Sequence, residues 1–211
     1  MHKSIFDRDC RACPRLAGFL DAVKERHPGY YCRPVPPFGD PAARFLIVGL
    51  APGLHGANRT GRPFTGDHAG ILLYQVLHKY GFASTAESVA SDDGLVLSQC
   101  RITNTVKCLP PDNKPIGAEI NNCNTFLANE LQLLPADSVV LALGGIAHRA
   151  IVKALGERQA DFSFAHAALH KLGHIRLLDS YHCSRYNTNT RRLTAAMFDA
   201  IFAEVRQLLD K

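Results

Sequence analysis

The sequence lacks the features that mark membrane, secreted and disordered proteins. No apolar run approaches the roughly 18–20 residues that a membrane-spanning helix needs. The first residues, MHKSIFDRDCRACPRL, are polar and contain no apolar core of an export signal. Repeats and low-complexity tracts are absent, and a composition of 46% hydrophobic and 20% charged residues argues against wholesale disorder. We expect a single domain over residues 1–211, a cytoplasmic location and no membrane partner.

The charge balance favours anionic partners only mildly. The chain carries 24 Lys and Arg residues against 19 Asp and Glu residues, which gives a net charge of +5 with neutral histidines. Nucleic acid is one partner that such a surplus suits. Many small enzymes carry a similar surplus, so a nucleic-acid partner needs support from particular residues.

Short apolar segments alternate with segments of helical spacing, and Gly or Pro residues separate them. The predicted strands are 45–50, 101–106, 137–143 and 174–179. The predicted helices are 67–81, 115–134, 146–155 and 190–210. This alternation predicts an α/β fold with a central parallel sheet, in which functional groups gather at the carboxyl ends of the strands.

Seven cysteines without an export signal argue against a disulfide framework and raise the question of metal or cluster binding. Cys10 and Cys13 have C-x2-C spacing, and fourteen residues separate Cys108 from Cys123. Four thiolates can bind zinc tetrahedrally or hold an iron–sulfur cluster. The spacing does not choose between these two alternatives.

A glycine-rich loop, residues 53–66, follows the first predicted strand. It contains neither the GxxxxGK[ST] pattern nor the GxGxxG pattern, so it is neither of these phosphate-binding loops. Phe64 lies in this loop, where an aromatic side chain either offers a face for stacking or fills the core. Asp67 stands where the N-cap of the next helix is expected.

Three motifs together resemble the uracil-DNA glycosylase superfamily, in particular its family 5, the type b enzymes. They are GLAPG at 49–53 followed by GANRTGRPFTGD, TNTVKC at 103–108, and SYHCSRYNTNTRRLT at 180–194. The resemblance implies a three-layer αβα sandwich around a four-stranded parallel sheet. It implies a monofunctional hydrolase of DNA repair that removes uracil, and other deaminated or damaged bases such as hypoxanthine, leaving an abasic site. The implied location is with DNA in a prokaryotic-type cell.

The resemblance also implies a four-iron–four-sulfur (4Fe-4S) cluster held by Cys10, Cys13, Cys108 and Cys123. Such a cluster would join the N-terminal segment to the loop that follows the strand carrying Asn104. From these places in the chain we expect the cluster to be structural and distant from the base.

The resemblance assigns roles at the base to residues of all three motifs. Asn104 corresponds to the base reader, because one amide can accept from N3–H and donate to O4 of uracil. Phe64 corresponds to the aromatic that stacks on the base, and His182 to the residue that donates to O2 as the base departs. Ala51 and Gly53 belong to the turn beside the base.

The residue that activates water departs from the pattern of related families. Those families place Asp, Asn or Glu in the first motif, whereas this sequence has the apolar residues Leu50 and Ala51. Family 5 shares this departure. Asp67 is the matching carboxylate, with helix N-capping, or both roles together, as the alternatives. The apolar motif also predicts a wider pocket and a base range beyond uracil.

Contacts with DNA are expected mainly from the loop at 180–192. The side chains that can reach phosphates are Ser184, Arg185 and Asn187 in this loop, with Asn58 and Arg59 in the first loop. Arg185 or Tyr186 would fill the gap that the flipped base leaves in the duplex.

Other chemistries stay open at the level of sequence. A protein of this fold that lacks the usual carboxylate could bind damaged DNA without cleaving it, and a zinc hydrolase of nucleotides would use the cysteines for structural zinc. Cys183 beside His182 offers a Cys–His nucleophile. Lys107, close to Asn104, would matter if an amine attacked the sugar. We expect a monomer that acts on DNA containing uracil or other deaminated bases.

Overall fold

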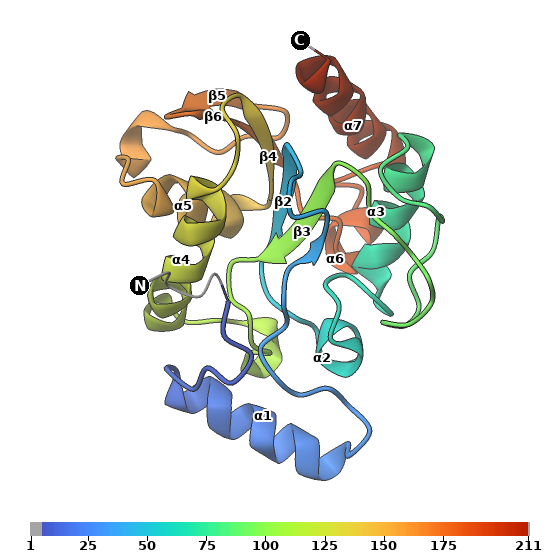
Figure 1. Cartoon of the computed structure of the whole chain (residues 1–211), viewed down its shortest axis with the longest axis vertical. Coiled ribbons are helices and arrows are strands. Elements are labelled where there is room, and N and C mark those ends of the chain that lie inside the picture. The colour runs from blue at the N-terminus through green and yellow to red at the C-terminus, as the bar shows by residue number, and fades with distance from the viewer. Residues whose placement is uncertain (1–5, 211) are drawn as a thin grey trace.

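The computed structural model describes residues 6–210, and its centre is a six-stranded sheet of order β1-β3-β2-β4-β6-β5 (Figure 1). The four inner strands are parallel: β3 (Cys100–Asn104), β2 (Phe45–Gly49), β4 (Ser138–Leu143) and β6 (Ile175–Ser180). The two edge strands, β1 (Phe38–Gly39) and β5 (Leu169–Leu172), are antiparallel to their neighbours. The predicted four-stranded parallel sheet is confirmed, and two short edge strands extend it.

Helices cover both faces of the sheet, which confirms the predicted three-layer αβα fold (Figure 1). One layer contains α3 (His68–Lys79) and α7 (Ala195–Leu209), and the other contains α4 (Gly117–Gln132) and α5 (Gly145–Ala154). Within residues 6–210, every helix is too short or too polar to cross a membrane.

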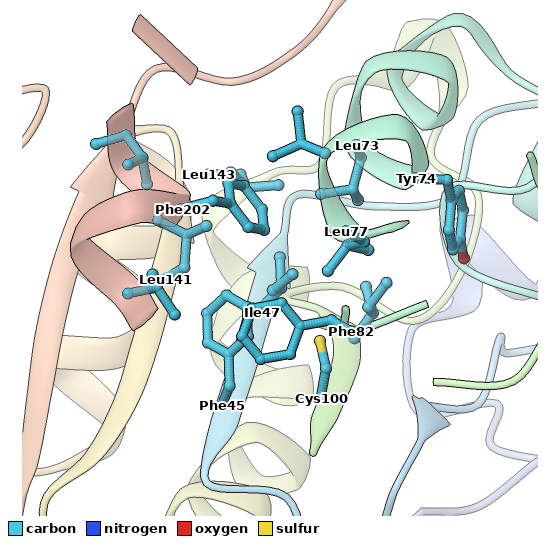
Figure 2. Packing of buried hydrophobic residues seen from close by; sticks show 14 of the residues in the cluster. Phe45, Ile47, Leu73, Tyr74, Leu77, Phe82, Cys100, Leu141, Leu143 and Phe202 are labelled. Carbon is cyan, nitrogen blue, oxygen red and sulfur yellow. The ribbon is translucent and has the colours of Figure 1, made fainter. Parts of the chain in front are cut away.

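An aromatic core fills the space between β2 and the α3–α7 layer (Figure 2). Successive side chains of a strand point to opposite faces, so Phe45 enters this core while Leu46 packs toward α4 and α5. The ring of Phe45 lies 5.0 Å from that of Phe82 and 5.9 Å from that of Phe202, measured between centroids. Residues of β2 are all buried, as its continuous apolar run predicted.

The C-terminal helix begins later than predicted. Thr194 is its N-cap, because its side chain accepts a hydrogen bond from the backbone N–H of Met197. The helix therefore starts at Ala195, and the predicted start near 190 is wrong. A separate short helix, α6 (Arg185–Asn189), precedes it.

Sequence reasoning did not predict the N-terminal helix α1 (Pro14–Arg26), which lies below the three layers in Figure 1. Its apolar side chains Leu16, Leu20 and Val23 are buried and pack into the cluster that includes Cys108 and Cys123. This packing holds the N-terminal C-x2-C pair near the other two cysteines. The remaining short elements are α2 (Ala57–Thr60) and the 3-10 turns η1 (Pro111–Asn113) and η2 (Gln159–Asp161).

The four parallel strands end at one edge of the sheet, as parallel pairing requires. The last residues of these strands are Gly49, Asn104, Leu143 and Ser180. The segments that follow them are therefore neighbours, although they are far apart in the sequence. Candidate functional groups gather at this edge.

Candidate active site

A cavity of about 480 Å³ lies at the carboxyl ends of the parallel strands. Its walls come from the loop after β2, the end of β3, the turn after β4 and the loop after β6. The residues predicted from sequence that line it are Ala51, Gly53, Phe64, Asp67, Asn104, His182, Ser184 and Arg185. The structure thus brings the residues assigned to the base into one site.

Gly49 lets the side chains of Asn104 and Phe64 lie close together. The sheet register pairs Gly49 of β2 with Asn104 of β3. A Cβ atom at Gly49 would lie 2.5 Å from Oδ1 of Asn104 and 2.6 Å from Cζ of Phe64, which is closer than atoms can approach. The amide of Asn104 and the ring of Phe64 therefore occupy the space that a side chain at position 49 would fill.

Phe64 adopts a backbone conformation that is costly for an aromatic residue. Its φ angle is +54°, in the left-handed region. Its carbonyl group packs so closely on Gly70 that a Cβ atom there would overlap it. The hydroxyl of Tyr74 donates to the carbonyl of the adjacent Pro63 at 3.0 Å. The ring both joins the hydrophobic core and lines the cavity, so the two interpretations of this aromatic are compatible.

Asp67 is the N-cap of α3, and the two oxygens of its carboxylate have different surroundings. Oδ1 accepts from the backbone N–H of Gly70 at 2.9 Å, which confirms the capping interpretation. Oδ2 lies against the glycine-rich loop, where a Cβ atom at Gly56 would approach it to 2.5 Å. Burial raises the pKa of Asp67, and the N–H groups of Gly70 and Ala69 oppose that rise in part.

His182 follows β6 and faces the ring of Phe64, with 6.0 Å between centroids and 27° between planes. The side chain of Asn187 donates to the carbonyl of His182 at 2.8 Å and fixes the loop there. Burial lowers the pKa of His182 to about 4, so the imidazole is neutral at physiological pH. Among the described residues, its Nδ1 atom is buried without a hydrogen-bond partner.

The predicted DNA-contacting residues fall into three groups. Arg59 and Arg185 are exposed, so both can reach phosphate, although Nε of Arg59 already donates to the carbonyl of His55 at 2.8 Å. Ser184 caps α6, and Asn187 supports the loop of His182. Asn58 is fully buried and donates to the sulfur of Cys32 at 3.5 Å. Asn58 therefore does not fit a role in phosphate binding, and the prediction for this residue is wrong.

Two alternative nucleophiles do not fit the structure. Lys107 is buried, and its ammonium group pairs with Glu130 at 2.7 Å instead of lining the cavity. Cys183 is fully buried in the hydrophobic core, and burial raises the pKa of its thiol to about 12. A thiol with that pKa supplies almost no thiolate at neutral pH.

Sequence reasoning missed several lining residues. Asn113 lines the cavity from η1, where both Asp112 and Asn113 have left-handed backbone angles. His68 lines it from the first turn of α3, and its Nδ1 is buried without a partner within residues 6–210. Gly144 and Gly145 line it after β4. The glycine pair could have been predicted to line the cavity, because it directly follows a predicted strand. No motif or residue spacing in the sequence indicates that Asn113 or His68 would do so.

The four cysteines assigned to a cluster are neighbours in the structure. Burial raises the pKa of Cys108, and Cys123, Cys10 and Cys13 raise it further. Among the described residues, no three of these sulfur atoms lie within 4.8 Å of one another. Thiolates around one zinc ion, with Zn–S bonds of about 2.3 Å, would be about 3.8 Å apart. The sulfur atoms are therefore further apart in this structure than the ligands of a single zinc ion would be.

The low pKa of His182 predicts that this side chain makes stability depend on pH. An unfolded histidine titrates near 6.5, whereas His182 titrates near 4 in the folded protein. Between these values the unfolded chain binds more protons, so the contribution of His182 is fully present above pH 6.5 and is lost as the pH falls toward 4. Urea unfolding at about pH 7 and about pH 5 should show a larger loss for the wild type than for His182→Gln. His78→Gln is the matched control and should behave as the wild type does, whereas equal losses in all three proteins would contradict the prediction.

Comparison with known proteins agrees with this geometry. A model of the uracil DNA glycosylase superfamily matches residues 36–206. A type-5 uracil-DNA glycosylase of Thermus thermophilus is 47% identical over 205 residues, which cover 94% of this chain and 93% of the relative. Another of Pyrobaculum aerophilum is 43% identical over 190 residues, which cover 88% of this chain and 83% of the relative.

A solved structure supports the fold alone. The crystal structure of wild-type Pedobacter heparinus SMUG2 matches with a TM-score of 0.51 at 12% identity, covering 97% of this chain and 92% of that chain. The family model and the relatives together identify the group, because the matches extend over most of the chain. The chain belongs to the uracil-DNA glycosylase superfamily and, within it, to the type-5 enzymes.

Proposed function

We propose that the protein is a DNA repair glycosylase that hydrolyses the bond between uracil and deoxyribose in DNA and leaves an abasic site. The observation that carries this proposal is the meeting of the Asn104 amide and the Phe64 ring over Gly49, inside a cavity large enough for a base. Relatives named as type-5 uracil-DNA glycosylases support it. The whole cavity lies within one chain, so the proposal needs no second subunit. The substrate places the reaction in the compartment that holds DNA.

Base recognition begins when the nucleotide leaves the duplex and enters the cavity. Unstacking costs a few kcal/mol, and least for a mismatched base. The ring of Phe64 offers a face on which the base stacks. The amide of Asn104 accepts from N3–H and donates to O4, a pattern that uracil presents and cytosine does not.

His182 supports the departure of the base. As the glycosidic bond breaks, negative charge grows on the base and positive charge on the sugar. A neutral imidazole donates one hydrogen bond toward O2 without losing a proton. The buried surroundings that lower the pKa of His182 also strengthen this interaction, because little water competes.

Asp67 is the candidate that orients the attacking water. Leu50 and Ala51 line the cavity but carry no polar side chain. The carboxylate of Asp67 lines the same cavity, and burial has raised its pKa, which makes it a stronger proton acceptor. In this proposal, one oxygen caps α3 while the other faces water and accepts its proton as the C1′–O bond forms.

DNA contacts in the proposal come from exposed groups around the mouth of the cavity. Arg185 lines the cavity and stands beside Tyr186, of which 72% is exposed. Such an exposed aromatic ring suits insertion into the gap in the duplex. Arg59 adds positive charge from the first loop. Because Lys107 is buried in an ion pair, no matched amine is available for a second cleavage step, and the reaction is monofunctional.

We also propose that Cys10, Cys13, Cys108 and Cys123 hold a 4Fe-4S cluster. Their grouping and their wide spacing support this choice over a single zinc ion. The cluster would hold α1 against the segment that follows β3. Its place outside the cavity lining favours a structural role.

Substitution of Asp67 separates its two roles. Asn caps helices about as well as Asp, so Asp67→Asn should keep its stability while losing roughly 10²–10⁴-fold in the rate of uracil release. The measurement is incubation with a uracil-containing oligonucleotide, followed by alkali to cut abasic sites. Asp92→Asn, at an exposed position, is the control and should cut as the wild type does.

Each other outcome of this assay has a definite meaning. Scission by Asp67→Asn at the wild-type rate would reduce Asp67 to a helix cap. Binding of the oligonucleotide by the wild type without any scission would overturn the glycosylase proposal in favour of a protein that binds damaged DNA.

The apolar first motif predicts that hypoxanthine is also released. Leu50 and Ala51 leave room in a cavity of about 480 Å³ for a larger base. We expect the wild type to cut a hypoxanthine-containing oligonucleotide after alkali, and Ala51→Leu to lose more of this activity than of its activity on uracil. No release of hypoxanthine by a wild type that releases uracil would restrict the proposal to uracil.

Metal analysis tests the cluster. The purified wild type should contain about four irons and four acid-labile sulfides per chain. Cys123→Ser should lose both, whereas Cys100→Ala, which removes a buried cysteine of the hydrophobic core, should retain them. Zinc in place of iron would contradict the assignment.

A further inference from the structure

A cluster of ligand-type side chains lies outside both the cavity and the four cysteines. It contains His148 of α5, His170 of β5 and Asp179 of β6. One ligand atom from each residue lies within 4.8 Å of the other two, and within residues 6–210 this is the one group that meets that condition. None of the three lines the base cavity.

The hydrogen bonds of His148 show that a cation belongs at this place. Its Nε2 lies 2.9 Å from the carbonyl oxygen of Phe162, which can only accept, so Nε2 carries a hydrogen. In the neutral ring, Nδ1 then presents a lone pair, 2.8 Å from Oδ1 of Asp179. An ionised carboxylate also presents only lone pairs. At this distance a proton must lie between the two buried atoms to make their approach favourable, or a metal ion must replace that proton and move the two atoms further apart.

The other side of the cluster contains two unsatisfied atoms. Oδ2 of Asp179 and Nε2 of His170 are buried, and neither has a hydrogen-bond partner among the described residues. They lie 3.4 Å apart. Ligands at about 2.0–2.2 Å from a tetrahedral zinc ion are separated by about 3.3–3.6 Å, so this pair already has the spacing of two zinc ligands.

We propose that His148 Nδ1, His170 Nε2 and the carboxylate of Asp179 bind a zinc ion. The hydrogen bond from His148 Nε2 to a backbone carbonyl is the outer contact that metal-bound histidines commonly make, and it directs Nδ1 to the metal. Two neutral imidazoles and one carboxylate suit zinc in charge and ligand type. The side chain of His170 is 18% exposed, so the site lies close to the protein surface.

This zinc ion would join three segments of the chain. Asp179 precedes Ser180, Tyr181 and His182 directly, so the ion would fix the strand that delivers His182 to the cavity. α5 begins at the glycine pair that forms another wall of the cavity. The site is therefore structural, and it does not depend on the proposed reaction.

Zinc titration of the full-length protein tests the proposal. Wild type, His170→Ala and the control His174→Ala are dialysed with zinc chloride and then against zinc-free buffer, and zinc and iron are counted by mass spectrometry. We expect the wild type and His174→Ala to retain about one more zinc per chain than His170→Ala. Zinc should also raise the melting temperature of the wild type and of His174→Ala, but not that of His170→Ala.

Asp179→Asn is a second variant, equal in shape, and it should lose the same equivalent of zinc. Because the readout is a difference between variants, metal at the cysteines affects all proteins equally, and the iron count checks this. Equal zinc in the wild type, His170→Ala and Asp179→Asn would overturn the proposal and leave a proton as the cation between His148 and Asp179.

Discussion

The side chains of Asn104 and Phe64 pack so closely on Gly49 that nothing larger than hydrogen fits on its Cα atom. This contact places a polar amide and an aromatic ring side by side in the cavity wall, although Asn104 and Phe64 come from different segments of the chain. The left-handed backbone of Phe64 and the bare Cα atom of Gly70 are further parts of the same arrangement. The parallel sheet supplies the rigid base that keeps these close approaches in register.

Burial shifts the pKa values of Asp67 and His182, two of the titratable groups that line the cavity, in opposite directions, and in both groups the shift favours the neutral form. The acid Asp67 has its pKa raised, and the base His182 has its pKa lowered, so both neutral forms are favoured relative to water. Charge that develops on a departing base meets a poorly screened environment, in which each oriented donor has a large effect.

Periodicity and strand ends were enough to predict the parallel sheet and the four main helices, whereas the resemblance of three motifs to the uracil-DNA glycosylases indicated which side chains converge on the cavity. The edge strands gave no such signal: β1 has two residues, and β5 contains the polar residues His170 and Lys171. α1 has apolar residues at helical spacing after Pro14, so its signal was present in the sequence.

Other side-chain positions could not be predicted because they depend on tertiary structure. Asn58 was expected to contact DNA because its loop is polar, but the loop folds into a helical turn that turns this side chain inward. Asn113 lines the cavity because the backbone turns at Asp112 and Asn113, which both have left-handed angles. No local sequence pattern predicts this turn. The neighbours His182 and Cys183 face different environments, since one lines the cavity and the other is in the core.

The short segment from Asn104 to Cys108 connects the cavity directly to the cysteines. Its three intervening residues are all anchored: Thr105 and Val106 donate to the backbone of Gly49 and Leu50, and Lys107 pairs with Glu130. Its length is therefore fixed at both ends. An insertion or deletion of one residue here would misplace the amide of Asn104 and the thiol of Cys108 at once. Length variation among relatives should therefore be absent from this segment.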